Sequence, residues 1–358
     1  MAFNLSRNTK FVVSTVDTGW TSSNSFEIPV LDGYSFTQDT ETQTITVSEA
    51  GATPARGQRM YNTALAPAEF SFSTYVRPRF DATVSPDETR AVEQVLWDAL
   101  ASAALNGATT VSSASLDVDF AASAVNQLLK LNMYFYTGDT TYALTNAVLN
   151  VAEVDFSIDG IAMVTWSGFA DAVQERIAGT TAPDFAGSPK DYLEVDTASD
   201  FIVNKLSTVT LTNDADATAY TVVLTGGSFT IDNGITFLTP EELGVLNTPL
   251  DHFTGTRSIT GTITAYLRTG GTDDTGDLFN DLSTDTATTL HDFTCNLFVG
   301  GAGNKPRMEL NMAQAHVTIP TINVEDVLSV EITFTALGSA DFASTDEVTV
   351  KYIHTNSV

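Results

Sequence analysis

The chain has 358 residues, with 16 Lys and Arg against 44 Asp and Glu, and a formal net charge of −28 at pH 7. This balance excludes a protein that holds nucleic acid through basic patches, because such proteins neutralise phosphates with Lys and Arg. No apolar run approaches the ~20 residues of a membrane span, the N-terminus lacks the apolar core of a secretion signal, and the single cysteine, Cys295, excludes an internal disulfide.

The acidic charge has two interpretations. Carboxylates keep proteins soluble in saline habitats, and they also keep a surface from adhering to a polyanion. Both can hold for one chain.

Strand patterns dominate the sequence, and three of them occur twice in the same order. Residues 31–37 return as 224–230, residues 72–77 as 263–268, and residues 149–158 as 310–319. The offsets of 193, 191 and 161 residues indicate that the second copy lost material mainly between its second and third segments. The length also predicts about two domains. We therefore predict a first domain at 1–178, a linker at 179–199 and a second domain at 200–358.

Apolar and polar residues alternate with a period of two in the strongest segments, as in half-buried strands. Phe70, Phe72 and Val76 alternate with polar residues in the first copy. Farther along, Val154, Phe156 and Ile158 are expected in the core, which places Glu153, Asp155 and Asp159 on the opposite face. Asp159-Gly160 predicts a tight hairpin turn. In the second copy, Ala313, Ala315, Val317 and Ile319 alternate in one strand, and Val330, Ile332 and Phe334 alternate with Glu331 in the next.

Helix signals are few. Ser85-Pro86-Asp87-Glu88 has the form of a capping box with proline at the first helical position. It predicts a helix that buries Val92, Val95, Leu96, Ala99 and Ala103 and ends at Asn106-Gly107. A shorter counterpart is expected near 277–282. A second capping box at 239–242 predicts one or two further helical turns.

Two long polar segments interrupt the strands, at 39–67 and 233–256. Loops of this length inside a compact domain are uncommon and are usually functional or disordered. The first carries acidic residues early and basic residues late: Asp39, Glu41, Glu49, Arg56 and Arg59. It is either a floppy surface loop or an arm that orders on a neighbouring subunit.

Catalytic and metal-binding signatures are absent from the sequence. No phosphate-binding loop, nucleophile elbow or zinc motif occurs, and the four histidines are too widely spaced to pair as metal ligands. Acidic turns at 214–216 and 273–277 do not fit the EF-hand spacing. We expect no cofactor, no metal and no enzyme activity. The basic cluster of Arg77, Arg79 and Arg90, with Arg56 and Arg59, is expected to pair with carboxylates of an adjacent domain.

Together these segments resemble the major tail tube proteins of tailed bacteriophages. The similarity rests on the opening Phe3–Val13, the stretch Gly51–Arg59, the strand Phe70–Pro78, a helix and a final hairpin. The resemblance implies a mainly β fold of two tandem tail-tube-type β-sandwich domains, each with a flanking α-helix, whose inner sheets form a continuous β-barrel on oligomerisation. It also implies a ring of six domains and a long loop that reaches the next ring.

The resemblance further implies a structural subunit of the virion tail, assembled in the host cytoplasm. Its partners would be further copies of itself, the tape measure protein, the tail terminator and distal tail proteins, with double-stranded DNA passing through without specific binding. Because the chain contains the repeated unit twice, rings of three chains with pseudo-sixfold symmetry are favoured, although a hexamer is possible.

Channel and stacking residues can be predicted on this basis. The hairpin segments 149–171 and 310–337 contain no Lys or Arg, as a DNA channel requires. We predict that Glu153, Asp155, Asp159 and Glu331 face the lumen and that the segment with Asp39, Glu41, Glu49, Arg56 and Arg59 stacks rings. The alternative is a secreted or surface β-sandwich module that binds carbohydrate or calcium; a glycosidase is a third possibility.

Overall fold

The computed structural model describes residues 9–45, 59–120, 126–138, 140–184, 190–191, 200–243, 246–284, 292–324, 326–339 and 346–358. The fold is mainly β, and within these residues each half carries one α-helix, α1 (Gln94–Ala101) and α2 (Thr275–Thr284). The predicted fold class is confirmed at this level. No helix in the described part is long and apolar enough to cross a membrane.

The first repeat contributes four antiparallel strands to the main sheet. Their spatial order is β3 (Ser35–Thr37), β6 (Ala68–Tyr75), β13 (Met163–Ala170) and β12 (Thr140–Asp155). Strands β6 and β13 bury every second residue, which is the alternation that the sequence predicted.

The second repeat builds the same order from β18 (Leu224–Asp232), β21 (Ser258–Tyr266), β25 (Ser329–Leu337) and a run made of β23 (Arg307–Val317) and β24 (Thr321–Asn323). The register is also repeated. Ser35 lies opposite Ser71 in the first copy, and Ser228 lies opposite Thr262 in the second. These are the pairs that the sequence offsets of 193 and 191 residues bring into correspondence. The third match, with its offset of 161 residues, was wrong in register: it equates Asp155 with His316, whereas Asp155 lies opposite Met163 as Asn323 lies opposite Ser329.

The two repeats join into one sheet. Strand β12 pairs with β18, with Val151 opposite Asp232 and Asp155 opposite Ser228. The eight strands therefore run without interruption from β3 to β24, and they form no closed barrel within the described part of one chain.

Further strands pack behind this sheet, and their pairing is also duplicated. In the first repeat β2 (Ser25–Glu27), β1 (Thr9–Ser14) and β11 (Leu131–Thr137) pair in sequence and join β12. In the second, β17 (Ala219–Thr221), β16 (Thr208–Asn213) and β22 (Asp292–Val299) pair in sequence and join β23. Other described strands are β7 (Pro78–Asp81), β8 (Glu88–Ala91), β9 (Thr109–Val111), β10 (Leu116–Asp119), β14 (Ala172–Arg176), β15 (Lys190–Asp191) and β26 (Thr349–Ile353).

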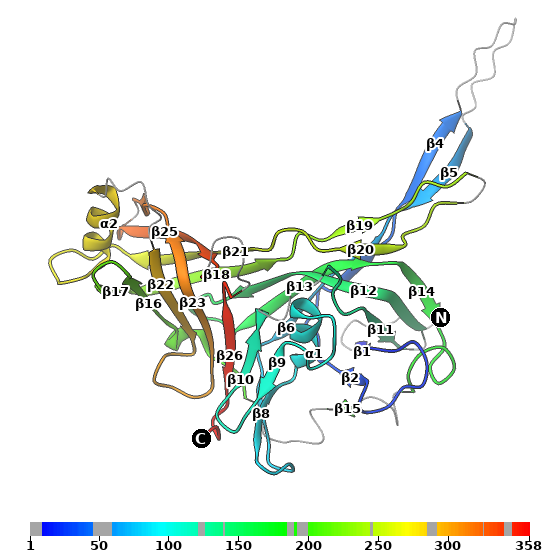
Figure 1. Cartoon of the computed structure of the whole chain (residues 1–358), viewed down its shortest axis with the longest axis horizontal. Helices are drawn as coiled ribbons and strands as arrows, with labels where there is room; N and C mark the ends of the chain where they lie inside the picture. Colours follow the sequence, from blue (N-terminus) through cyan, green and yellow to red (C-terminus); the bar gives the residue numbers. More distant parts are fainter. Residues whose placement is uncertain are drawn as a thin grey trace, which may run out of the picture.

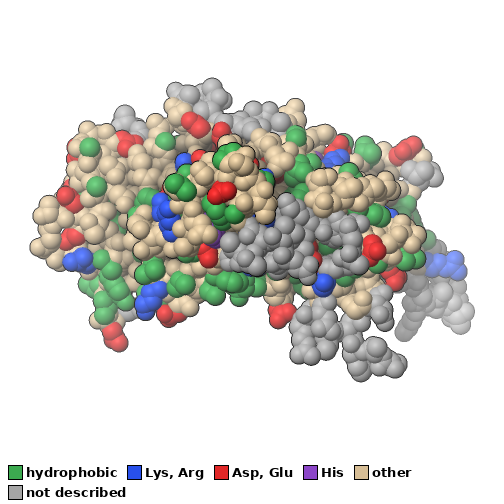
Figure 2. All heavy atoms as spheres, turned by 90° about the horizontal axis from the view of Figure 1, so that it is seen from below, with side chains coloured by type: hydrophobic (Ala, Val, Ile, Leu, Met, Phe, Trp, Pro, Cys, Tyr) green, Lys and Arg blue, Asp and Glu red, His purple; other side chains and the backbone are tan. Residues whose placement is uncertain are grey.

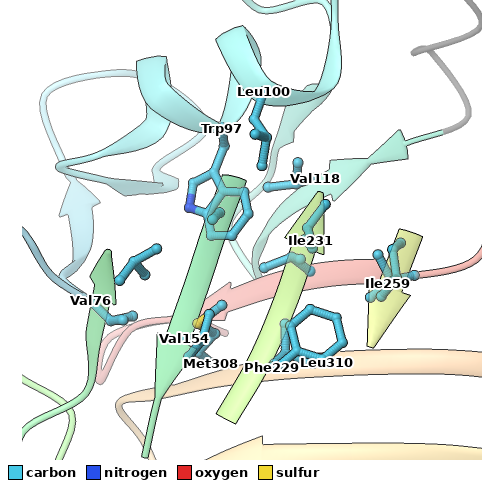
Figure 3. Packing of buried hydrophobic residues seen from close by; sticks show 14 of the residues in the cluster. Val76, Trp97, Leu100, Val118, Val154, Phe229, Ile231, Ile259, Met308 and Leu310 are labelled. Atoms are coloured by element: carbon cyan, nitrogen blue, oxygen red, sulfur yellow. The ribbon is translucent and has the colours of Figure 1, made fainter. Parts of the chain in front are cut away.

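One hydrophobic core serves both repeats. Trp97 and Leu100 of α1 lie over Val154 of the first repeat and Phe229 and Ile231 of the second (Figure 3). The C-terminal strand β26 pairs with β10 of the first half and β23 of the second. The two repeats are therefore packed together through side chains as well as through the sheet.

The helix predictions were partly wrong. Residues 88–91 form β8, paired with β7, and α1 begins only at Gln94. It ends at Ala101 because the buried Asp98 carboxylate accepts hydrogen bonds from the backbone N–H groups of Asn106, Ala108 and Thr109, which folds the following residues into a loop. Helix α2 has 10 residues against eight in α1, so it is not the shorter one. Residues 239–243 form no helix within the described residues.

The hairpin predictions also need correction. Seven residues, 156–162, connect β12 to β13, so Asp159-Gly160 is not a two-residue turn, and Ile158 is 43% exposed. In β23, two residues stand opposite one of β22 between the pairs Phe293–Ala315 and Cys295–Met312. This bulge reverses the alternation. Ala313 is therefore exposed while Ala315 and Val317 are buried.

The predicted linker and the basic cluster are more integrated than expected. Ala182 is fully buried within 179–184, and β15 pairs with β2. Arg79 and Arg90 bind Asp81 and Glu88 of their own hairpin, at 3.2 and 2.5 Å. Each of these two arginines therefore has a carboxylate partner within its own hairpin.

Candidate functional site

The exposed face of the eight-stranded sheet is a regular surface built from strands of both repeats. Because neighbours in register share a face of a sheet, the pairings define rows of side chains across it. One row consists of Ser73, Thr165, Glu153, Thr230, Thr260, Thr335 and His316. The next consists of Tyr75, Met163, Asp155, Ser228, Thr262 and Thr333. The surface is therefore made mainly of hydroxyl groups with interspersed carboxylates.

Hydroxyl groups bond to one another across this face. Ser73 and Thr165 lie 2.9 Å apart on β6 and β13, and Thr318 and Thr333 lie 2.5 Å apart beside β25. Such cross-strand pairs stabilise the sheet.

The structure places three of the four predicted lumen residues on this face. Glu153 and Asp155 project from β12 and Glu331 from β25, all exposed. Asp159 lies beyond the end of β12, in the 156–162 loop, so it is at the rim of the face and not within it. Whether this face lines a channel stays a prediction.

Two acidic residues of the face were missed by the sequence analysis. Glu69 of β6 is exposed, and Asp232 ends β18 in register with Val151. The alternation around Phe70 and Phe72 already marked Glu69 as facing away from the core. Asp232 could be found only once β18 was known to pair with β12.

Basic residues are kept away from this face. The eight strands contain no Lys or Arg along their paired lengths, apart from Arg307 at the start of β23, where it contacts Glu309 at 2.6 Å behind the main sheet. Other basic side chains also bind carboxylates, for example Lys351 with Asp117 at 3.1 Å and Lys130 with Asp251 at 2.7 Å. On the face seen in Figure 2, Lys and Arg side chains lie in small separate groups.

Both long polar segments form β-ribbons that leave the same end of the sheet. Strands β4 (Thr40–Ile45) and β5 (Arg59–Leu65) form the first, and β19 (Thr236–Leu238) and β20 (Asp251–Phe253) form the second. The first ribbon projects far from the body, and the second follows its base (Figure 1). We call the two ribbons together, residues 39–45, 59–67, 233–243 and 246–256, the composite arm.

Backbone hydrogen bonds hold the composite arm together. The N–H of Leu65 donates to the carbonyl oxygen of Asn247 at 2.8 Å, and the N–H of Asn247 donates to that of Thr63 at 3.3 Å. The second ribbon is in turn fixed to the first repeat, because the N–H of Leu128 donates to Nε2 of the buried His252 at 3.0 Å. Burial lowers the pKa of His252, which favours the neutral ring that accepts this bond.

The predicted stacking residues lie on this arm as far as they are described. Asp39 and Glu41 are exposed at the start of β4 and Arg59 at the start of β5, with Ile45 opposite Arg59. Glu49 and Arg56 lie outside the described residues. The sequence did not predict that the segment is a paired ribbon, nor that the second segment packs against it.

No known protein-family model matches the chain. A comparison with known proteins gives a clear relative, the tail tube protein pb6 of Escherichia phage T5. It is 35% identical over 355 residues, which cover 97% of this chain and 75% of the relative. The chain belongs to the tail tube proteins of bacteriophages. The resemblance drawn from the sequence is thereby confirmed, and this tail tube protein is a structural component of the virion tail. The composite arm and the polar sheet face are consequently the surfaces on which its assembly and its channel are to be sought.

Proposed function

We propose that three copies of this tail tube protein close a ring whose inner wall is the eight-stranded sheet, and that stacked rings enclose the tape measure protein and conduct double-stranded DNA. The observation that carries this proposal is the exposed face of that sheet, which bears hydroxyls and carboxylates but no Lys or Arg. The role is structural and not enzymatic.

The proposed ring uses two tandem tube domains per chain, at 1–178 and 200–358, joined by 179–199. The repeated strand order and register support this division. Each repeat supplies four strands to the wall, so three chains would give 24 strands and six pseudo-equivalent positions. Six chains per ring would instead require the second repeat to lie outside the wall, which its continuous pairing with β12 disfavours.

The chemistry of the wall suits transport of DNA. A Lys or Arg on the wall would release counterions from each passing phosphate and so attract the DNA. Repeated along the tube, that attraction would retard movement. Glu69, Glu153, Asp155, Asp232 and Glu331 repel phosphates, and the surrounding hydroxyls hold water. The tail terminator and distal tail proteins would then cap the two ends of the tube.

The junction within one chain indicates how neighbouring chains would join. Strand β3 pairs only with β6, and β24 only with β25, in the described part, so each leaves one edge open. Open edges are templates for further pairing. Asp155 and Asn323 hold equivalent places, since Asp155 pairs with Met163 as Asn323 pairs with Ser329. Because Asp155 faces Ser228, which corresponds to Ser35, ring closure should bring Asn323 of one chain opposite Ser35 of the next.

A cross-linking experiment tests this closure. The double variant Ser35→Cys/Asn323→Cys should, after assembly and oxidation, give covalent species of up to three chains on denaturing gels, because directly opposed residues have Cβ atoms ~5 Å apart. The native Cys295 should not interfere, since it is buried and burial raises the pKa of its thiol to about 12.

The control for this experiment shifts one partner by two residues. Thr37→Cys/Asn323→Cys keeps the face but breaks the register, and should cross-link poorly. Ladders that continue to six chains, or equal cross-linking by both variants, would contradict the proposed closure.

A further inference from the structure

The strands of the wall end in two rims, which are defined by the pairings. The arm rim contains Thr37, Ala68, Ala170 and Asp232, and the composite arm departs from it. At the other end, the hairpin-tip rim contains Tyr75, Met163, Asp155, Tyr266 and Ser329. The two rims therefore lie at opposite ends of the same strands.

Exposed large hydrophobic side chains are concentrated at these rims. Of the 22 found in the described part, eight belong to the composite arm: Ile45, Met60, Tyr61, Leu238, Leu243, Leu246, Leu250 and Phe253. Nine others lie at the hairpin-tip rim or in the segment packed against it: Ile158, Ile161, Phe201, Val203, Leu206, Tyr266, Val324, Val327 and Leu328. Patches of this kind mark interaction sites.

The segment 200–206 belongs to the hairpin-tip rim by direct contacts. The N–H of Ala162 donates to the carbonyl oxygen of Ile202 at 2.9 Å, and the N–H of Asn204 donates to that of Gly160 at 3.1 Å. Next to these buried or half-buried partners, Val203 is 52% exposed and Leu206, at the end of η3 (Asn204–Leu206), 53%. The backbone is fixed while the apolar side chains face outward, which is the state of a preformed docking surface.

We infer that the apolar residues of the composite arm dock onto the hairpin-tip rim of a second copy in the neighbouring ring, and that this apolar contact, not pairing of the arm's charges, holds rings together. This inference rests on the proposed function. A second copy of this chain presents the complementary rim. Because the two patches lie at opposite ends of the wall, a ring that uses its arms on one neighbour still has its hairpin-tip rim free for the next ring. Such head-to-tail contacts generate open filaments.

The arm's own charges fit this inference. Glu41 and Arg59 are both exposed, on opposite strands of the ribbon, where exposed ion pairs stabilise little. By contrast, Leu243 and Leu250 of the second ribbon are 101% and 62% exposed, and removing such apolar side chains from water favours association.

Two sets of variants test the inference by electron microscopy of tubes and native mass spectrometry of rings. Val203→Asp/Leu206→Asp on the tip rim and Leu243→Asp/Leu250→Asp on the arm should each reduce mean tube length at least tenfold while rings still form. Glu41→Gln/Arg59→Gln should leave tube length within twofold of the parent protein. Ile177→Asp is the matched control, because Ile177 is 67% exposed but lies on neither rim.

The outcomes separate the inference from the proposal on which it rests. Normal tubes from both apolar variants, or short tubes from the charge-neutral variant alone, would overturn apolar stacking while leaving ring closure intact. If the parent protein itself formed no three-chain rings in native mass spectrometry, the proposed ring would be overturned instead. Shortening by Ile177→Asp equal to that of the rim variants would show that added charge, not the rim, matters, and would also overturn the inference.

Discussion

Glu93 is a buried carboxyl group at the junction of the two repeats, and it predicts a specific pH dependence of stability. It lies just before α1, where its Oε1 accepts a hydrogen bond from the N–H of Arg77 at 3.1 Å. The hydroxyl of Tyr352 on β26, which accepts a hydrogen bond from Nε1 of Trp97 at 2.7 Å, favours the charged form of this carboxyl group and so lowers its pKa. Burial raises the pKa of Glu93 to about 7, against the lowering effects of Tyr352 and Arg77.

The sign and size of the effect follow from linkage. Since the folded state holds this proton more tightly than the unfolded chain, stability falls as the pH rises from about 4.5 to about 7. Compared with low pH, where Glu93 is protonated in both states, the free energy of unfolding falls by about 1 kcal/mol at pH 5 and by about 3 kcal/mol at pH 7.5 because of Glu93. These values take one pKa unit as about 1.4 kcal/mol. Glutamine keeps the acceptor for Arg77 but cannot ionise. The free energy of unfolding of Glu93→Gln, relative to that of the parent protein, should therefore rise by about 2 kcal/mol from pH 5 to pH 7.5.

Urea denaturation followed by tryptophan fluorescence measures this difference. Trp97 and Trp166 report it directly, because both are fully buried with ring centroids 4.9 Å apart. Glu69→Gln is the control, since Glu69 is exposed on β6 and should show no comparable pH-dependent gain. A Glu93→Gln variant that is destabilised equally at pH 5 and pH 7.5 would refute the reasoning.

Three further predictions concern the wall and the arm. Gly168→Ala should destabilise the fold by about 3 kcal/mol or more in the same assay, because a Cβ there would lie 2.0 Å from a backbone oxygen of β12; Gly303→Ala, with nothing within 4 Å, should change little. Glu153→Lys/Asp155→Lys should still assemble but slow DNA passage in an infectivity assay, with the slowing relieved as salt rises; normal infectivity would contradict the wall assignment. Deletion of residues 41–59 should leave the circular dichroism of the subunit largely unchanged but abolish long tubes, and tubes of normal length would show that the first ribbon is dispensable.

The sequence predicted the strands of the main sheet better than the elements packed around them. Period-two alternation in 68–76 and 330–335 identified the buried faces correctly, because a half-buried strand imposes that pattern regardless of its partners. It failed at Ala313, where a bulge reverses the alternation, and bulges depend on the partner strand.

Local sequence patterns predicted the wrong structure where contacts with distant parts of the chain determine the fold. The capping box at 85–88 has the right residues for a helix start, yet pairing with β7 makes residues 88–91 a strand. The sequence could not predict that the two ribbons form one composite arm. Leu65 and Asn247 are far apart in sequence, and the hydrogen bond that joins them is between backbone groups. Side-chain patterns carry no information on such contacts.

The central claim is that the polar face of the continuous eight-stranded sheet lines the channel. A cryo-electron microscopy map of assembled tubes, with strands and side chains traced, tests it most directly. We predict three chains per ring, a closed wall of 24 strands, Ser35 opposite Asn323 at each chain boundary, and Glu153, Asp155 and Glu331 pointing into the lumen. A map with six chains per ring, or with those carboxylates on the outside of the tube, would contradict it.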